Sequence, residues 1–161
     1  LIIIKGNIYF CSHGGISTSG FTREHMRGLY KPVYRSNEDT LIQDITWSDP
    51  AGALRGSAYN KDRGSSIFFG FDELCKALAS MEVVAIFRGH SQCKAGYLNQ
   101  WNVCYTLFTA TNYENSHSEG AVAYIGPTGK LDMQTLVEDK NRTVWEDRLA
   151  KIEYAFPKGS A

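Results

Sequence analysis

The sequence has no long hydrophobic run, no excess of charge of either sign and no internal repeat. No apolar stretch approaches the roughly 20 residues that a membrane-spanning helix needs, so we expect no membrane partner. Seventeen basic residues balance seventeen acidic ones. This balance gives no indication of a nucleic-acid partner, and we expect none. At 161 residues, 43% hydrophobic and 21% charged, the composition is typical of one soluble globular domain.

The four cysteines, Cys11, Cys75, Cys93 and Cys104, include no closely spaced pair. Cys11, Cys75 and Cys104 lie in apolar stretches, where we expect them to be small buried hydrophobic residues. Unpaired cysteines are typical of a reducing compartment. The sequence therefore predicts an intracellular protein, cytoplasmic or nuclear.

The first stretch of the chain predicts a hairpin that ends at a histidine. Residues 1–4 and 8–11 are apolar and flank the turn-forming segment Lys5-Gly6-Asn7. The second strand stops at His13, which two glycines follow. A side chain at such a strand end lies where ligands are commonly bound, although an ordinary hydrogen-bonded histidine fits the pattern equally well. The chain starts without methionine, inside a predicted strand, so we expect it to enter partway through a fold.

Further elements follow from periodicity and turn residues. Helical spacing predicts helices over 22–30 and 71–80, whereas 39–47 is either helical or extended. Residues 51–66 are rich in Gly, Ala and Ser and predict a long loop, which carries Arg63. Apolar runs predict strands over 83–87, 103–109 and 120–125, and a further strand is expected over 130–136, after the turn at Pro127-Thr128-Gly129.

Polar residues follow three of these strands: His13, His90 and the pair Asn112-Tyr113. If one sheet edge presents them all, two neutral imidazoles could bind a transition metal such as Zn, Fe or Mn. The Arg63 guanidinium matches paired phosphate oxygens, and the Tyr113 hydroxyl could donate to a third oxygen. Two histidines alone are fewer ligands than a catalytic metal site needs.

Five ordered motifs carry a resemblance to a known family. They are Ser12-His13-Gly14-Gly15-Ile16-Ser17, Asp44-Ile45-Thr46-Trp47-Ser48-Asp49-Pro50, Asp62-Arg63-Gly64, Phe87-Arg88-Gly89-His90 with Gly96-Tyr97, and Thr109-Ala110-Thr111-Asn112-Tyr113 through Gly120-Ala121. In order and spacing they resemble the C-terminal half of the PPP-type serine/threonine protein phosphatases, members of the calcineurin-like metallophosphoesterases. The resemblance covers residues 1–136. It implies an α/β fold, a partial metallophosphoesterase fold that is half of a two-sheet β-sandwich flanked by helices.

The resemblance also implies residue roles. His13 and His90 would be ligands of one ion in a dinuclear site of divalent metals, Mn, Fe or Zn. Arg63 would bind the phosphoryl oxygens and Tyr113 would line the site. Asp49 would orient an arginine or the substrate-side loop, although a carboxylate before a proline is also a common turn residue. In the complete fold, a metal-activated water would hydrolyse phosphoserine or phosphothreonine in a phosphoprotein substrate.

The family's first three motifs, GDxHG, GDxxDRG and GNHE, do not occur in the 161 residues. They supply the other metal ligands in the family, so we expect one ion at most in this chain and no activity from it alone. The partners implied are the N-terminal half or another chain that supplies it, and a regulatory subunit. The alternative is a non-catalytic structural or docking module derived from a phosphatase. Residues 137–161 are expected to form a C-terminal extension, with a helix over 144–154.

Overall fold

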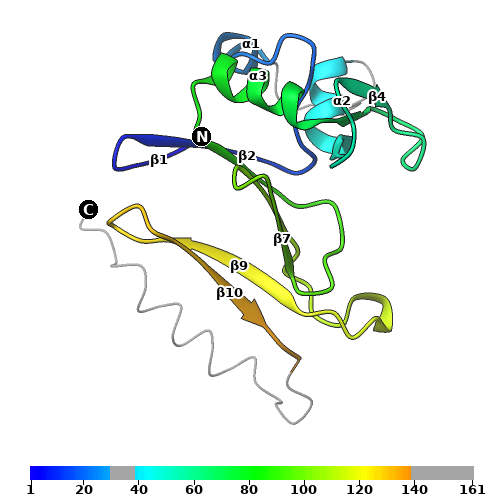
Figure 1. The fold of residues 1–161 in the computed structure, drawn as a ribbon, viewed down its shortest axis with the longest axis vertical. Coiled ribbons are helices and arrows are strands. Elements are labelled where there is room, and N and C mark those ends of the chain that lie inside the picture. Colours follow the sequence, from blue (N-terminus) through cyan, green and yellow to red (C-terminus); the bar gives the residue numbers. More distant parts are fainter. Residues whose placement is uncertain (30–38, 139–161) are drawn as a thin grey trace.

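The structure is a computed structural model that describes residues 1–29 and 39–138, and it has the predicted mixed α/β architecture (Figure 1). The helices are α1 (Arg23–Gly28), α2 (Thr40–Trp47), α3 (Phe71–Met81) and the 3-10 helix η2 (Tyr113–Asn115). The strands are β1 (Ile2–Ile4), β2 (Asn7–Ser12), β3 (Asp49–Pro50), β4 (Ser57–Tyr59), β5 (Ile67–Phe69), β6 (Ala85–Arg88), β7 (Tyr97–Gln100), β8 (Cys104–Leu107), β9 (Gly120–Ile125) and β10 (Leu131–Leu136). The helix predicted over 144–154 lies outside the described residues.

The central sheet has five strands in the order β1-β2-β6-β8-β7. Strands β2, β6 and β8 are parallel to one another, and β1 and β7 are antiparallel strands at the two edges. Ser12 of β2 is paired with Arg88 of β6. Because parallel strands end at the same side of a sheet, this register brings the residues after Ser12 and Arg88 next to each other.

The predicted hairpin at the start of the chain is confirmed. Strand β1 pairs with β2 in antiparallel register, with Ile4 opposite Asn7. The two residues between them, Lys5 and Gly6, have φ angles of 53° and 80°. Two consecutive positive φ angles are typical of the tight turn whose twist matches that of the flanking strands.

The two faces of the central sheet are covered differently (Figure 1). Helices α1, α2 and α3 lie on one face, above the main hydrophobic core, which contains Phe10, Ile16, Phe21, Leu41, Phe69, Leu74, Met81, Ile86 and Cys104. The antiparallel hairpin β9–β10 covers the other face, with Tyr9, Ala85 and Phe87 of the sheet packed against Ala123, Ile125, Leu131 and Met133. Two stacked β layers with helices outside match the predicted half-sandwich.

Several local expectations need correction. The segment 51–66 is not a continuous loop, because Ser57–Tyr59 form β4 in a small sheet of order β3-β5-β4. This sheet was hard to predict because its strands have only two or three residues. Strand β7 was not predicted either, since its four residues show no alternation of apolar and polar side chains.

The expected burial of the cysteines was wrong for two of the three. Cys104 is fully buried on β8, but Cys11 and Cys75 are exposed. On α3, Leu74 is buried while Phe71 is 45% exposed. In the described part of the chain, no helix is both long and apolar enough to cross a membrane.

Candidate metal and phosphate site

The ends of β2 and β6 bring His13 and His90 together, as the sequence predicted for strand ends. The amide of Gly89 donates to the carbonyl oxygen of His13 at 3.0 Å, which joins the two loops directly. Nε2 of His13 and Nδ1 of His90 lie 3.0 Å apart, with the rings inclined by 76°. Residues separated by 77 positions in the sequence therefore face each other with two ring nitrogens.

The loop after His13 depends on its two glycines. The Gly14 amide donates to Ile45 O at 2.8 Å. A Cβ atom on Gly14 would lie 2.5 Å from the backbone carbon of Thr46, and one on Gly15 would lie 2.6 Å from the Phe69 ring. Only residues without a Cβ let this loop pack so closely against the C-terminal end of α2.

His90 occupies an unusual backbone position. Its φ is +68°, in the left-handed region that non-glycine residues rarely adopt. Its ring lies edge-on to Trp47 with centroids 5.2 Å apart, and its Nε2 is buried without a hydrogen-bond partner among the described residues. Burial and the positive charge of Arg63 lower the pKa of His90 to about 4. The ring is therefore neutral at pH 7, the state in which imidazole binds a metal.

The histidine pair fits two ligand positions of one metal ion. Metal–imidazole bonds are about 2.0–2.1 Å long, so two nitrogens bound side by side on one ion lie about 3 Å apart. The observed separation of Nε2 and Nδ1 is 3.0 Å. Across residues 1–29 and 39–138, no cluster of three or more His, Cys, Asp or Glu side chains is placed to hold a metal. The pair could thus supply part of a coordination shell.

Asp49 connects Arg63 to this pair. The Arg63 Nε donates to Asp49 Oδ2 at 2.9 Å, and its Nη2 donates to the His90 carbonyl oxygen at 3.4 Å and to Ser91 Oγ at 3.3 Å. The Asn60 side chain, fully buried, donates to the same Oδ2 at 3.0 Å. The guanidinium of Arg63 is therefore fixed beside the His90 loop.

The carboxylate of Asp49 is saturated with donors. Its Oδ1 accepts hydrogen bonds from Arg88 Nη2 at 2.7 Å and from Ser91 Oγ at 2.8 Å. Burial alone would raise the pKa of Asp49, but the hydrogen bonds from Arg63, Asn60 and Ser91 and the charge of Arg88 outweigh it and lower the pKa to about 2. Asp49 is thus a stable anion between two arginines.

Arg88 is a further component of the site. It lies in the motif Phe87-Arg88-Gly89-His90, but the sequence predicted no role for it. It is 3% exposed, and burial lowers the pKa of its guanidinium. Its guanidinium donates to Gly14 O, Ser48 O (3.3 Å), Asp49 Oδ1 (2.7 Å), Ser91 Oγ (3.2 Å) and Thr106 Oγ1 (3.3 Å). The signal was present in the sequence, since a charged residue that continues a buried strand needs a counter-charge nearby.

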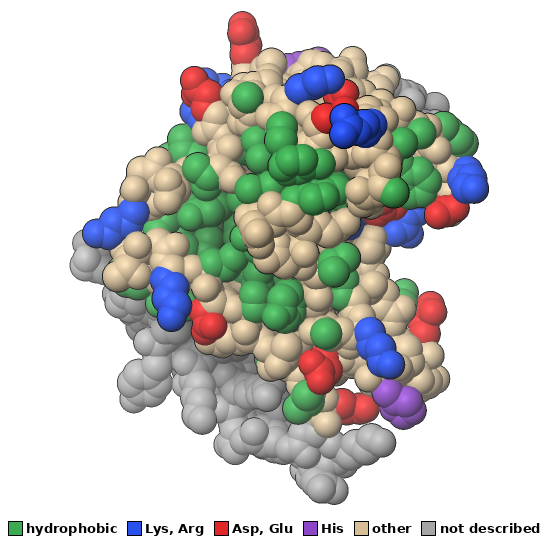
Figure 2. All heavy atoms as spheres, in the orientation of Figure 1, with side chains coloured by type: hydrophobic (Ala, Val, Ile, Leu, Met, Phe, Trp, Pro, Cys, Tyr) green, Lys and Arg blue, Asp and Glu red, His purple; other side chains and the backbone are tan. Residues whose placement is uncertain are grey.

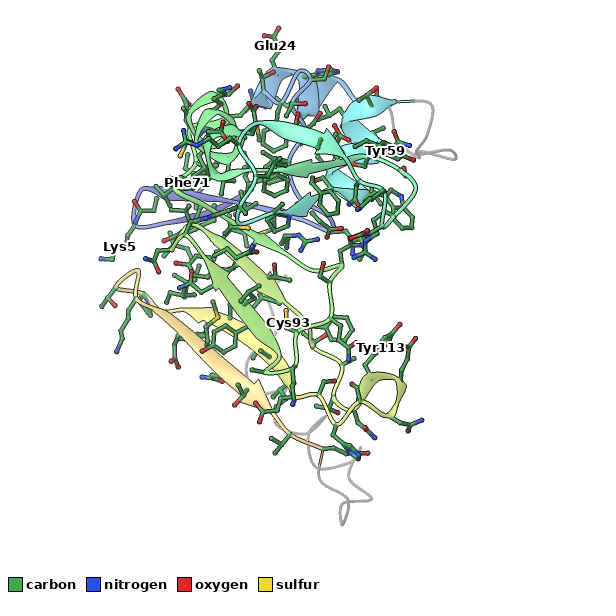
Figure 3. The ribbon with its side chains drawn as sticks, turned by 45° about the vertical axis from the view of Figure 1, so that its right-hand side comes forward. Lys5, Glu24, Tyr59, Phe71, Cys93 and Tyr113 are labelled. Atoms are coloured by element: carbon green, nitrogen blue, oxygen red, sulfur yellow. The ribbon has the colours of Figure 1, made fainter. Side chains whose placement is uncertain are left out.

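The structure places Tyr113 on a separate loop, η2, to the right of Cys93 in Figure 3. Its ring packs edge-on against Phe108 with centroids 5.1 Å apart and is 43% exposed. This loop is tied to the His90 loop by the hydrogen bond from Gln92 Nε2 to Ser116 Oγ, at 2.6 Å. No hydrogen bond of the described residues joins the Tyr113 hydroxyl to His13, His90 or Arg63, so its role stays a prediction.

Two cavities flank the histidine pair. One, of about 360 Å³, is lined by Arg63, Asp49 and Arg88, and the other, of about 450 Å³, is lined by His13 and the helix residues around Met26. The side chain of Arg63 is 31% exposed. A ligand entering beside Arg63 can therefore reach its guanidinium.

Comparison with known proteins identifies the family of the chain. A profile of the calcineurin-like phosphoesterases matches residues 1–94, more than half of the chain. The chain belongs to the calcineurin-like phosphoesterase family. Family members generally use a dinuclear metal site.

The relatives of this calcineurin-like chain are named as phosphatases. It is 36% identical over 136 residues to a putative serine/threonine-protein phosphatase of Caenorhabditis elegans, covering 81% of the chain and 29% of that protein. It is 32% identical to the serine/threonine-protein phosphatase with EF-hands 1 of Homo sapiens, covering 73% of the chain and 17% of that protein. The chain thus spans less than a third of the length of these relatives.

A solved structure supports the fold. A protein serine/threonine phosphatase from Saccharomyces cerevisiae superimposes with a TM-score of 0.72 at 21% sequence identity, covering 84% of this chain and 46% of that one. The predicted partial metallophosphoesterase fold is confirmed by this likeness. The assignment of residues 1–136 to one half of a phosphatase domain stays a prediction.

Proposed function

We propose that this chain is part of a metal-dependent serine/threonine protein phosphatase, in which it supplies two metal ligands and one phosphate-binding arginine. The observation that supports the proposal is the pair of ring nitrogens, His13 Nε2 and His90 Nδ1, 3.0 Å apart and beside Arg63. The remaining ligands come from polypeptide that carries the motifs GDxHG, GDxxDRG and GNHE. The substrate is phosphoserine or phosphothreonine in a protein.

Each residue of the proposed site has a separate task. His13 and His90 hold one ion, and His90 does so as a neutral ring at pH 7. When bound, divalent ions activate water and stabilise the charge that develops on phosphoryl oxygens. Arg63 presents N–H groups to the phosphoryl oxygens, while Asp49 fixes its orientation by accepting from Nε. Tyr113 borders the site from its neighbouring loop.

A chimera tests this function. Residues 1–136 replace the matching segment of the Caenorhabditis elegans relative, which retains its own N-terminal part. We expect the folded chimera to hydrolyse a phosphoserine peptide in the presence of Mn²⁺. Arg63→Ala should lower kcat/KM by about 10²–10³-fold, the usual loss when one donor to a transition-state oxyanion is removed. Arg55→Ala, which changes an exposed arginine ahead of β4, serves as the matched control and should leave kcat/KM unchanged.

The 161-residue chain alone should release no phosphate from p-nitrophenyl phosphate with Mn²⁺, because its ligand set is incomplete. A chimera that folds, as judged by circular dichroism and thermal unfolding, but hydrolyses nothing would contradict the phosphatase proposal and favour the docking-module alternative. Equal activity of Arg63→Ala and Arg55→Ala would contradict the role of Arg63.

A further inference from the structure

We propose that Arg88 is the positioning residue of the site: its guanidinium holds the loops after β2, α2 and β6 so that the rings of His13 and His90 face each other. The inference rests on the proposed function only in treating these two rings as metal ligands. Arg88 itself touches neither ring in the described contacts. It acts through the backbone and side chains around them.

The first support is the number of its contacts. A guanidinium has five N–H groups, and five acceptors surround this one. They belong to the His13 loop (Gly14 O), the segment after α2 (Ser48 O and Asp49 Oδ1), the His90 loop (Ser91 Oγ) and strand β8 (Thr106 Oγ1). Both loops that carry a proposed metal ligand are thus tied to a single buried side chain.

The second support is that Asp49 and Ser91 connect Arg88 to Arg63. Asp49 accepts from Arg88 and Ser91 on one oxygen, and from Arg63 and Asn60 on the other. Ser91 contacts both arginines and the same carboxylate. Displacement of Arg88 would therefore shift both the His90 loop and the guanidinium of Arg63.

The third support is the place of the Arg88 contact on the His13 loop. The backbone of this loop is held by the Gly14 amide to Ile45 O and by the Gly89 amide to His13 O, and further along by hydrogen bonds from Ser12 Oγ to Gly15 O and from Ser48 Oγ to Ile16 O. Among the described hydrogen bonds, only that from Arg88 Nε to Gly14 O joins a side chain to the residue directly after His13. A lysine at position 88 keeps the positive charge opposite Asp49 but has one nitrogen, which cannot serve all three loops.

The test compares Arg88→Lys with Arg23→Lys in the 161-residue chain. Arg23 is a matched control because its guanidinium also joins distant segments, donating to Met81 O at 2.6 Å and Glu82 O at 2.8 Å, and none of its described hydrogen bonds reaches the His13 or His90 loop. Both variants lose a guanidinium bridge between segments. Any effect that only reflects lost stability should appear in both.

Two readouts report on the rings. Nuclear Overhauser contacts between the ring protons of His13 and His90 report their mutual position without metal. Titration with Mn²⁺ then broadens the ring signals of ligating histidines, and the exposed His25 and His117 act as internal references. The chain has four histidines, so each ring signal can be assigned by single substitution.

We expect Arg88→Lys to lose the contact between the rings and to weaken Mn²⁺ binding by about 10–100-fold, as is usual when residues behind metal ligands are changed. Arg23→Lys should keep the contact and bind Mn²⁺ within twofold of the wild type. A folded Arg88→Lys with both readouts unchanged would overturn the proposal.

If the wild-type rings show their contact but Mn²⁺ does not broaden their signals, the metal role in the proposed function fails. The positioning role of Arg88 is then decided by whether Arg88→Lys loses the contact between the rings. If Arg88→Lys does not fold, Ser91→Ala replaces it. That smaller change removes one hydroxyl between Arg88, Arg63 and Asp49. It should weaken Mn²⁺ binding at least about threefold, and an unchanged affinity and ring contact would reject the proposal.

Discussion

At the scale of single residues, the site depends on a buried carboxylate between two cations. Asp49 has a pKa of about 2 in the folded chain, below its ordinary value of 3.8. An acid whose pKa is lowered by folding stabilises the folded state above its unfolded pKa. That contribution disappears as the pH falls through the folded pKa. Asp49 therefore contributes stability above about pH 4 that is lost toward pH 2.

We predict that Asp49→Asn lowers the free energy of unfolding at pH 7 by about 3 kcal/mol, because it leaves the buried Arg88 without a counter-charge. The difference between wild type and variant should shrink as the pH is lowered from 4.5 to 2.5. Urea unfolding at several pH values measures it. Asp132→Asn, on the exposed face of β10, is the control and should show no such trend. A difference that stays constant over this range would contradict the ionised role of Asp49.

At the scale of elements, the packing of the His13 loop against the end of α2 decides where the histidine lies. A Cβ on Gly14 would come within 2.5–2.6 Å of the backbone of Thr46 and Trp47. These are backbone atoms of a helix end, so they cannot move as a flexible side chain would. The loop and the helix would have to separate.

Gly14→Ala should therefore lower the free energy of unfolding by about 1–3 kcal/mol, the usual cost of overpacking. The control is Gly52→Ala, because a Cβ there would meet nothing within 4 Å. Chemical denaturation of both variants gives the comparison. Equal stabilities of the two variants would show that the loop is not packed as described.

The strand order explains which parts of this arrangement could be predicted. Apolar runs of ordinary length predict the hairpin, β6, β8 and β9. The meeting of His13 with His90 follows from parallel strands that end together. The short strands β3, β4 and β5 could not be predicted, since two or three residues carry no periodicity. Because that small sheet was not predicted, only the resemblance indicated that Asp49 would orient an arginine or the substrate-side loop.

Some site features lie beyond what a pattern encodes. The positive φ of His90 and the burial of Arg88 are set by tertiary contacts, not by local propensity. Tyr113 follows a predicted strand only after a turn, and its ring packs on Phe108 on a separate loop. Its part in the site therefore stays a prediction, whereas the meeting of His13 and His90 follows directly from the strand register.

At the scale of the whole molecule, the described surface includes an apolar edge. Strand β1 lies at one edge of the central sheet, and Ile3 is 68% exposed there, beside the similarly exposed Leu1 and Ile2. Hydrophobic side chains are also visible across the middle of the view in Figure 2. An exposed apolar edge strand is a site for self-association.

We predict that Ile3→Lys raises the concentration at which the chain self-associates and lowers its binding of the dye ANS, because a lysine on an edge strand opposes pairing. The free energy of unfolding should change by less than about 0.5 kcal/mol, as for most surface substitutions. Sedimentation velocity over a concentration series measures the association. Tyr59→Lys, at a similarly exposed position on β4, is the control and should leave the self-association unchanged. If Ile3→Lys also leaves the self-association unchanged, β1 takes no part in it.

The central claim is that two histidines from different strands share one metal ion. Crystals of the 161-residue chain soaked in Mn²⁺ test it by anomalous scattering at the manganese edge. The account predicts one anomalous peak within bonding distance of both His13 Nε2 and His90 Nδ1, and its loss in His13→Ala. No peak between the two rings, or a peak that persists in His13→Ala, would contradict it.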